Sequence, residues 1–240
     1  MAYLWQQCSG GARLILHGDP IIFGLLWVTV RVALVSTAAA VAIGLPFGVV
    51  LGLGRFRGRR ALQILANASL ALPPVVVGVV VLLLLVPQGA LGSLRIGFTL
   101  TAVYVVQTIL ALPYVVALTP AAIQGVAPGL LDQARALGAA RLQLAVLALR
   151  EARIGMVAAV IAALGAAVSE VGAVVIVGGN VVGHDQTLAS SLLANFTYGD
   201  TDPHNAGIAI MLAILVIVLL GSLSLLAHRS GGIRLRFRGG

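Results

Sequence analysis

The most informative absence in this 240-residue chain is lysine, because all 15 basic side chains are arginine. A phosphate-binding P-loop needs a lysine on the β- and γ-phosphates, and a cofactor held as a Schiff base needs a lysine amine. Neither chemistry is open to this chain. If the protein uses ATP, a different polypeptide has to bind it.

Other reactive side chains are scarce as well. Cys8 is the single cysteine, which rules out an internal disulfide and a cysteine-rich metal site. The four histidines, at positions 17, 184, 204 and 228, never have the i, i+4 spacing of a helical zinc site. The sequence also lacks the clustered His, Asp and Ser residues of a membrane-embedded hydrolase. We therefore expect no catalytic residue, no metal site, no cofactor bound by this chain and no enzyme activity of its own.

Charged residues make up only 9% of the chain, whereas hydrophobic residues make up 60% and the mean hydropathy is +1.09. Since a soluble domain has about 25% charged residues, this composition predicts a multi-pass protein of the plasma (inner) membrane. The net charge of +8 does not indicate nucleic acid binding, because the arginines lie in short clusters between apolar runs. The lipid bilayer is the expected partner of these runs.

Five apolar stretches are long enough to cross about 30 Å of hydrocarbon, which takes roughly 20 helical residues. They are residues 21–54, 62–86, 98–118, 154–177 and 207–227. The predicted fold class is an all-α integral membrane protein with five transmembrane helices, an extracytoplasmic segment at 1–20 and a basic cytoplasmic tail at 228–240. The first stretch counts as one span that begins along the interface, with Trp27 at headgroup level. Other residues are expected in loops, apart from the cytoplasmic loop described below and a short helix at 188–196, which lies at one surface or dips into the membrane.

The arginines predict the topology, because positive residues that flank spans are retained in the cytoplasm. One side of the predicted membrane has three groups of arginines, at positions 55, 57, 59 and 60, at 135, 141, 150 and 153, and at 229, 234, 236 and 238. The other side has only Arg13 and Arg95, together with four aspartates. We therefore predict that the N-terminus is outside and the C-terminus is cytoplasmic. Arg31, near the outer end of the first span, is expected to snorkel.

The cytoplasmic loop between the third and fourth spans, residues 122–153, contains a short helix with an apolar stripe. Pro128 is placed to begin this helix and Gly138 to end it. The stripe consists of Leu130, Leu131, Ala134 and Leu137. A second amphipathic run, 139–153, leads into the fourth span. Such a short helix suits insertion into a groove of a partner protein, and the alternative is an amphipathic helix that rests on the bilayer.

Residues 132–138, DQARALG, resemble the EAA signature of type I ABC-transporter permeases, which is Glu-Ala-Ala followed by three residues and Gly. Asp132 stands at the Glu of the signature, Ala134 and Gly138 match it, and Gln133 departs from the first Ala. The Leu-Pro that usually follows is absent. In that family the loop docks on the cytoplasmic ATPase. The resemblance therefore assigns ATPase coupling to Leu130, Leu131, Asp132, Gln133, Ala134, Arg135, Ala136, Leu137 and Gly138.

Other stretches resemble the same family, so that the likeness covers nearly the whole chain. Residues 29–52 are similar to its first core span and residues 72–78, LPPVVVG, to its second. The run 169–180, SEVGAVVIVGGN, is most similar to permeases of the tungstate type in the molybdate/tungstate group.

This resemblance implies an ATP-driven importer of an oxyanion, tungstate first, that works by alternating access. Molybdate or another small solute is the alternative cargo. The implied partners are a second copy in a homodimer, two cytoplasmic ABC ATPase subunits that bind ATP and Mg²⁺, and an extracytoplasmic oxyanion-binding protein.

The fourth predicted span contains the candidate translocation path. Its small residues form one face, which suits either a packing seam within the protomer or a subunit interface; they are Ala158, Ala162, Gly165, Ser169 and Gly172. Glu170 is the only carboxylate well inside a span, at a depth where an ionised acid costs roughly 2.5–3.5 kcal/mol. It either lines the path or holds a gate, through a hydrogen bond to backbone or a pair with an arginine such as Arg31. Because it would repel a dianion, it is not the group that binds the cargo.

The turn Gly178–Gly179–Asn180 follows at the outer end of this span. It offers backbone N–H groups and an amide to an oxyanion, or it is a plain helix stop. The candidate path or gate residues are therefore Ser169, Glu170, Gly172, Gly178, Gly179 and Asn180. A rival function is a self-standing channel or ion-coupled carrier, which needs no docking loop and for which Glu170 is the one candidate to bind a coupling ion.

Overall fold

The computed structural model describes residues 1–127, 129–199 and 202–231, and within these ranges all regular secondary structure is helical. The helices are α1 (Ala2–Leu16), α2 (Pro20–Leu53), α3 (Arg59–Ser69), α4 (Pro74–Leu85), the 3-10 turn η1 (Gly92–Leu94), α5 (Leu100–Gln124), α6 (Leu130–Ala136), α7 (Arg141–Glu151), α8 (Arg153–Ser169), α9 (Gly172–Gly178), α10 (Leu188–Thr197) and α11 (Pro203–Gly231). The expectation of an all-α protein is confirmed for this part of the chain.

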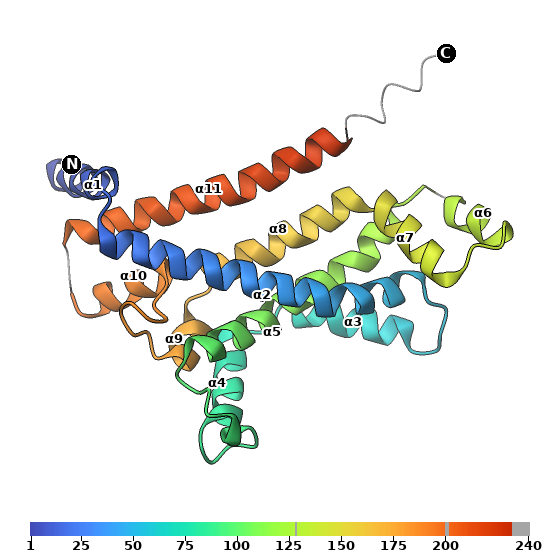
Figure 1. Ribbon diagram of the computed structural model, residues 1–240, viewed down its shortest axis with the longest axis horizontal. Coiled ribbons are helices and arrows are strands. Elements are labelled where there is room, and N and C mark those ends of the chain that lie inside the picture. Colours follow the sequence, from blue (N-terminus) through green and yellow to red (C-terminus); the bar gives the residue numbers. More distant parts are fainter. Residues whose placement is uncertain (128, 200–201, 232–240) are drawn as a thin grey trace.

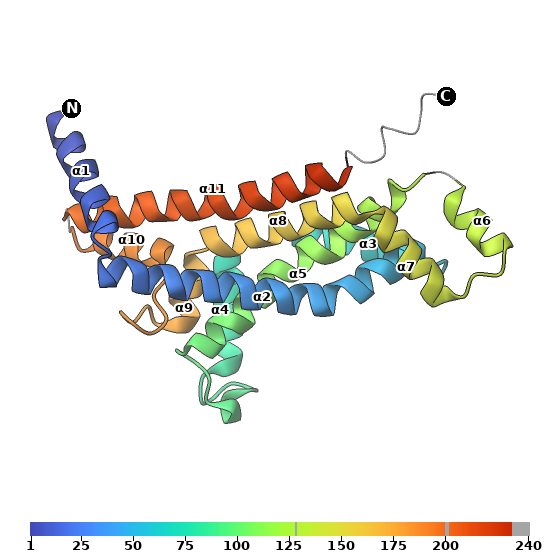
Figure 2. The ribbon, with the colours of Figure 1, turned by 45° about the horizontal axis from the view of Figure 1, so that its top comes forward.

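The long helices α2, α5, α8 and α11 run along the long axis of the molecule (Figures 1 and 2). Helix α1 lies across one end of this bundle, and α6 and α7 lie at the opposite end, near the start of α3. Helix α4 projects from the side of the bundle. Arginines 55, 59, 135 and 141, which the topology prediction places in the cytoplasm, therefore flank helices that meet at one end.

Three helices are long and apolar enough to cross a membrane, namely Pro20–Leu53, Leu100–Gln124 and Pro203–Leu225. The number rises to as many as 5 if each of two bent helix pairs is one span. Several membrane-crossing helices are thus established, while the number of five and the orientation of the termini stay predictions.

Helix α2 is a single rod of 34 residues, about 51 Å long at a rise of about 1.5 Å per residue. Its start is fixed by Asp19, whose Oδ1 accepts the N–H groups of Ile21 and Ile22 at 3.0 Å each, and by Pro20 at the first helical position. Its end is fixed by Arg59, which donates to the carbonyls of Leu51 at 2.7 Å and Gly52 at 3.0 Å. The stretch predicted as one span is therefore one continuous helix, and the interfacial position of its beginning stays a prediction.

The stretch predicted as the span 62–86 forms two helices, α3 and α4, which meet at a bend of 99°. Pro73 disfavours helical backbone in the residue before it and donates no N–H, so α3 ends ahead of the proline pair. Pro74 then begins α4, where a missing N–H is tolerated. The bend turns α4 towards α9, and the two backbones approach closely at Gly78, where a Cβ would lie 2.8 Å from the Cα of Ala173.

The predicted span 154–177 is also interrupted. Helix α8 ends at Ser169, Glu170 is extended with φ −74° and ψ 127°, and α9 begins at Gly172. The hydroxyl of Ser169 donates to the carbonyl of Gly165 at 2.8 Å, a bond that competes with continuation of the helix. The fourth stretch is therefore two helical segments with a break at its carboxylate.

Residues 2–16 were expected to be a non-helical segment, and this is wrong because they form α1. The short helix expected at 188–196 is confirmed by α10, whose first four residues are buried against the bundle. Helix α5 passes through Pro113 and Pro120 and ends at Gln124, beyond the predicted end at 118.

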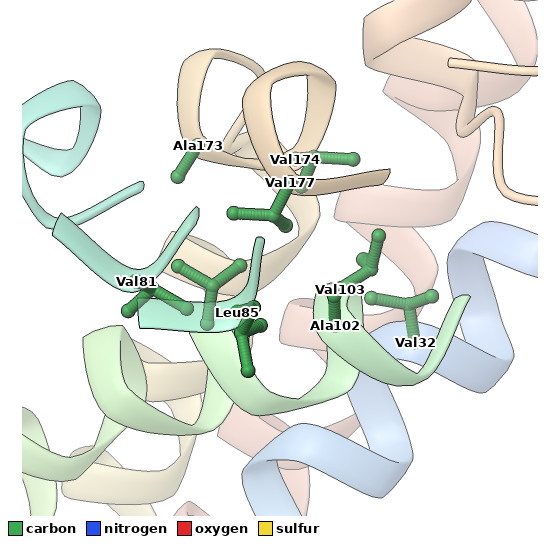
Figure 3. Packing of buried hydrophobic residues seen from close by; sticks show 9 residues of the cluster. Val32, Val81, Leu85, Ala102, Val103, Ala173, Val174 and Val177 are labelled. Carbon is green, nitrogen blue, oxygen red and sulfur yellow. The ribbon is translucent and has the colours of Figure 1, made fainter. Parts of the chain in front are cut away.

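The core is divided into clusters between neighbouring helices. The cluster in Figure 3 joins α2, α4, α5 and α9 and consists of Val32, Val81, Leu85, Ala102, Val103, Val106, Ala173, Val174 and Val177. Small and β-branched side chains dominate it, which allows the backbones to approach closely where lipid supplies no hydrophobic driving force between helices. This cluster holds α4 and α9 against the long helices and so positions the region described next.

Candidate functional site

A cavity of about 910 Å³ lies inside the elbow between α3 and α4. Helices α2, α5 and α8 form its other walls, and most of its lining is apolar. The polar side chains in the lining are those of Ser69, Tyr114, Ser169 and Glu170. None of the described lining residues is basic. The cavity therefore offers hydroxyl groups and one carboxylate, but no cation, to a solute.

Glu170 stands at the break between α8 and α9, in the wall of this cavity. Its Oε1 accepts the backbone N–H of Ala173 at 2.9 Å, in the first turn of α9. The first N–H groups of a helix have no partner within the helix, so the carboxylate supplies one. Gly172 is next to it, and a Cβ there would lie 2.6 Å from Val75 Cγ2 of α4. The structure thus brings Ser169, Glu170 and Gly172 together beside the cavity.

Two interactions were considered for Glu170, and the structure contains the bond to backbone. In the described part of the chain no ion pair joins Glu170 to Arg31. The guanidinium of Arg31 instead lies 5.9 Å from the centroid of the Tyr104 ring, which is within the range of a cation–π contact.

Gln107 also acts at the break, and the sequence reasoning missed it. It lies on α5 with 1% of its surface exposed, and its Nε2 donates to the carbonyl of Ala167 at 3.4 Å. That carbonyl is in the last turn of α8, where carbonyls lack partners within the helix. Gln107 therefore contacts the end of α8 while Glu170 contacts the start of α9. The sequence feature that could have identified Gln107 is that it is a polar residue inside the apolar stretch 98–118.

The residues Gly178, Gly179 and Asn180 form a separate site, beyond α9 and away from the cavity lining. The N–H of Asn180 donates to Asp185 Oδ2 at 3.1 Å, and the N–H of Val181 donates to Asp185 Oδ1 at 2.7 Å. The N–H of Gly179 donates to Val175 at 3.2 Å. The donors expected for an oxyanion are thus taken up by the protein, chiefly by a carboxylate that is fully buried. Sequence reasoning did not single out Asp185 as this partner.

The candidate coupling segment forms α6 at the end of the bundle. Left-handed glycines flank it, Gly129 with φ 85° and Gly138 with φ 82°, which few other residues adopt without strain. Pro128, expected to begin the helix, lies outside the described residues. Asp132 pairs with Arg135 at 2.6 Å and with Arg55 at 3.8 Å, so that α6 is linked to the segment between α2 and α3.

The expected apolar stripe of this segment does not point in one direction. Leu131 packs against the cluster of Ile123, Ala148 and Ala152, whereas Leu137 is 89% exposed. Leu142, at the start of α7, is 76% exposed. The free apolar surface at this end therefore comes from the segment after α6 and not from its first turn.

These features define a class of protein. Broken helices are tolerated at membrane depth where they are buried in protein or line a cavity, and a bundle of membrane-length helices with such a break beside a cavity is the architecture of a membrane transport protein.

Comparison with known proteins gives the family. The chain belongs to the family described as "Binding-protein-dependent transport system inner membrane component", which matches residues 44–229. It is therefore a membrane subunit of an ABC transporter, located in the inner membrane, and the family implies ATPase subunits and a binding protein as partners.

Individual relatives agree with this assignment. A protein of Haloferax volcanii described as a probable anion ABC transporter permease is 40% identical over 85% of this chain and 90% of its own length. The tungstate uptake system permease protein TupB of Peptoclostridium acidaminophilum is 30% identical over 90% of this chain and 94% of its own. The fold is similar to a chain of the MetNI methionine ABC transporter in an inward-facing conformation, with a TM-score of 0.65 and 23% identity over 88% of this chain and 96% of that one.

Proposed function

We propose that this chain is the permease subunit of an ATP-driven importer of an oxyanion, with tungstate as the cargo and molybdate as the alternative. The observation that carries the proposal is similarity along almost the full length to relatives named for anion and tungstate transport. The run 169–180, which resembles tungstate permeases, includes the break beside the cavity.

The cavity inside the α3–α4 elbow is the proposed translocation path. The hydroxyl of Tyr114 provides a donor for oxyanion oxygens, whereas the hydroxyls of Ser69 and Ser169 already donate to the carbonyls of Ala66 and Gly165. The lack of a basic residue in the described lining keeps binding weak. Weak binding suits a path that has to release its cargo, and it leaves affinity to the external binding protein. Glu170 does not bind the cargo but holds the start of α9 through Ala173.

The second proposed element is a homodimer. Three small residues of the fourth stretch lie outside the buried positions of α8, since Ala158 and Ser169 are exposed and Ala162 is half-buried. Gly165 and Gly172 instead face neighbours within the protomer, because an added Cβ would lie 3.4 Å from Leu220 of α11 and 2.6 Å from Val75 of α4. The first three residues favour a subunit interface, and the two glycines belong to an internal seam. A second copy against this face would close the path from the other side.

Coupling to a separate ATPase is proposed for α6 and the residues after it. Leu137 and Leu142 are largely exposed and give this end an apolar surface that suits a groove of a partner protein. The ion pair between Asp132 and Arg55 connects α6 with the residues that follow α2. Closure of the ATPase dimer would bring the α6 segments of the two copies together. This movement would change the side of the membrane to which the path opens.

Transport measurements test the cargo and the energy source. We expect cells that lack this subunit to lose uptake of tungstate from nanomolar medium while sulfate uptake is unchanged, and the intact gene to restore it. Equal loss of sulfate would overturn the cargo assignment. Uptake that persists when the ATPase subunit cannot hydrolyse ATP would favour the channel or carrier.

A matched pair of variants tests coupling. Leu137→Asp places a charge on the exposed apolar surface after α6. We expect the variant to lose ATPase binding in co-purification and to lose uptake. Because Leu137 is 89% exposed, the fold should stay intact. Val182→Asp, at a position that is 72% exposed in the turn after α9, is the control and should leave ATPase binding unchanged. If Leu137→Asp retains the ATPase and transports normally, the docking assignment is wrong.

A further inference from the structure

We propose that α1 is an interfacial helix, which lies in the headgroup layer of the membrane with its free face turned to lipid. The observation that points to this is an exposed apolar face. Trp5 is 77% exposed and Leu16 is 83% exposed. Eleven residues separate them, so at about 3.6 residues per turn they project from the same side of the helix.

The opposite face of α1 fastens it to the bundle. At Gly11 the backbone of α1 lies against α11, so closely that a Cβ would be 2.8 Å from the carbonyl carbon of Ala206 and would clash with Gly207. Leu14 and Ile15 pack against the cluster that includes Ile22 and Ile208. These contacts hold α1 at a fixed position along the long axis of the bundle. They also keep its exposed face turned away from the other helices.

Helix α1 lies beside the residues at which the apolar runs of α2 and α11 begin, which is the boundary of the membrane-crossing region. Gly207 and Ile208 begin the apolar run of α11, and Ile22 begins that of α2. Both views of the ribbon show α1 lying across the end of the bundle, not along it (Figures 1 and 2). A helix in this position runs along the membrane surface, at the depth where headgroups meet acyl chains.

The composition of the free face fits lipid better than it fits a protein partner. Tryptophan is enriched at membrane interfaces, where its ring is apolar and its N–H can bond to headgroups. Arg13 is the only charged side chain within α1 and lies in its last turn, where it can contact a phosphate. The free face thus carries Trp5, Ala12 and Leu16, with the small side chains of Cys8 and Ser9 beside them and Arg13 at its edge. Such an apolar face with a cationic edge is found in helices that lie on bilayers. This inference rests on the fold alone and is independent of the cargo.

The native cysteine allows a test without any substitution. Cys8 is exposed and is the only cysteine, and it lies one turn after Trp5. A nitroxide on Cys8, in the full chain reconstituted in vesicles of phosphatidylcholine and phosphatidylglycerol, reports depth through its relative collisions with oxygen and with a water-soluble nickel chelate. We expect a depth at the level of the headgroups. If the label collides with the chelate as freely as a label in water, the proposal is overturned. Shielding from both oxygen and the chelate would overturn it as well, because a second copy or another protein would then cover α1.

Tryptophan emission gives an independent measurement. The chain has 2 tryptophans, so Trp27→Phe leaves Trp5 as the single reporter. We expect its emission to lie at shorter wavelength than in water and to fall when brominated lipid replaces ordinary lipid. The matched variant Trp5→Phe reports Trp27, which is 66% exposed on the membrane-crossing helix α2 and serves as the lipid-contacting reference. Emission of Trp5 that brominated lipid does not change would contradict the proposal, while the nitroxide measurement stands even if Trp27→Phe fails to fold.

Discussion

Glu170, Gln107 and Asp185 are polar side chains that serve the same purpose, since each bonds to backbone groups at a helix end. Glu170 accepts an N–H at the start of α9, Gln107 donates to a carbonyl at the end of α8, and Asp185 accepts two N–H groups after α9. Backbone groups freed by a break at membrane depth need partners, because little water is present to supply them. Glu170 and Gln107 therefore supply partners on the two sides of the break, and Asp185 does the same after the end of α9.

The bond between Glu170 and Ala173 leads to a prediction about uptake. Glu170→Ala leaves the Ala173 N–H without its partner, which costs about 1–3 kcal/mol for a buried donor, and we expect it to reduce ATP-dependent tungstate uptake in proteoliposomes strongly. Glu170→Gln keeps a carbonyl acceptor and removes the charge, so uptake should be close to that of the parent. If Gln is as inactive as Ala, the charge itself is required and Glu170 belongs to an ion-binding or path role.

The importance of Glu170 was predictable from the sequence, but its partner was not. A carboxylate in an apolar stretch is costly and attracts notice in any sequence. The N–H that it accepts is free only because α8 ends at Ser169, and residues 154–177 continue the apolar pattern across that point with no proline. Asp185 was unpredictable for the same reason, since its role depends on a left-handed turn at Gly179 and Asn180.

Asp19 leads to a prediction about pH. The N–H of Ile22, and then His204 at 3.3 Å, hold the pKa of the Asp19 carboxyl below its usual value of 3.8. A lowered pKa in the folded state means that Asp19 contributes stability above the unfolded pKa, and that this contribution is lost as the pH falls through the folded one. We expect the start of α2 to loosen below about pH 4, seen as faster amide exchange at residues 20–23. In Asp19→Ala this part of the pH dependence should vanish, and an unchanged profile would show that Asp19 is not its source.

At the scale of the element, glycines set how closely α2 approaches α5. At Gly48 a Cβ would lie 2.5 Å from the Cβ of Thr119, and at Gly44 it would lie 3.1 Å from the Cβ of Val115. Such approach is typical of membrane helix packing, where small residues permit backbone contact. It also explains why the helix pair tolerates Pro46 and Pro113, because each helix is supported by the other along its length.

Two glycines of the same helix provide a controlled comparison. Gly48→Ala forces Thr119 and its backbone to move, so we expect a loss of about 1–3 kcal/mol, as in other overpacked sites. Gly24→Ala meets nothing within 4 Å and should be neutral or stabilising by up to about 1 kcal/mol through helix propensity. Thermal unfolding in detergent measures both. Equal behaviour of the two variants would show that α2 and α5 are not in close contact.

The elements that sequence reasoning placed correctly are those with a strong local signal. Helices α2, α5 and α11 are long, apolar and uninterrupted by loops, and α10 has a threonine cap at Thr187. Helix α1 was missed because Gly10 and Gly11 weaken its local helix propensity, and those glycines are the residues that allow it to pack on α11. The α3–α4 bend was marked by Pro73 and Pro74, but its angle depends on the contact with α9.

At the scale of the whole molecule, one protomer leaves apolar surface without a partner on α4 and α8. Six side chains of α4 are exposed, namely Val75, Val76, Val79, Val80, Leu83 and Leu84. Lipid covers such surface equally well, so exposure alone does not identify an interface. The small residues of α8 are more specific, because a close helix contact needs them and lipid does not.

The proposed dimer predicts a difference between two faces. Ala162→Trp fills the small face of α8, and we expect it to lower the dimer fraction of the purified chain, measured by native mass spectrometry in detergent. Leu34→Trp, at a position of α2 that is 47% exposed, should leave the fraction unchanged. If the dimer is unaffected by Ala162→Trp, the subunit interface lies elsewhere, with α4 as the next surface to probe.

The length of α2 has a mechanical consequence. At about 51 Å it exceeds the hydrocarbon thickness of about 30 Å. It is attached near both ends, through Asp19 to His204 at one end, and at the other through Arg59 of α3 and through Arg55, which pairs with Asp132 of α6. A rigid rod that pivots about its middle by about 5° moves each end by about 2 Å, in opposite directions. If α6 docks on the ATPase as proposed, a movement at that end would be transmitted by leverage to the opposite end of α2.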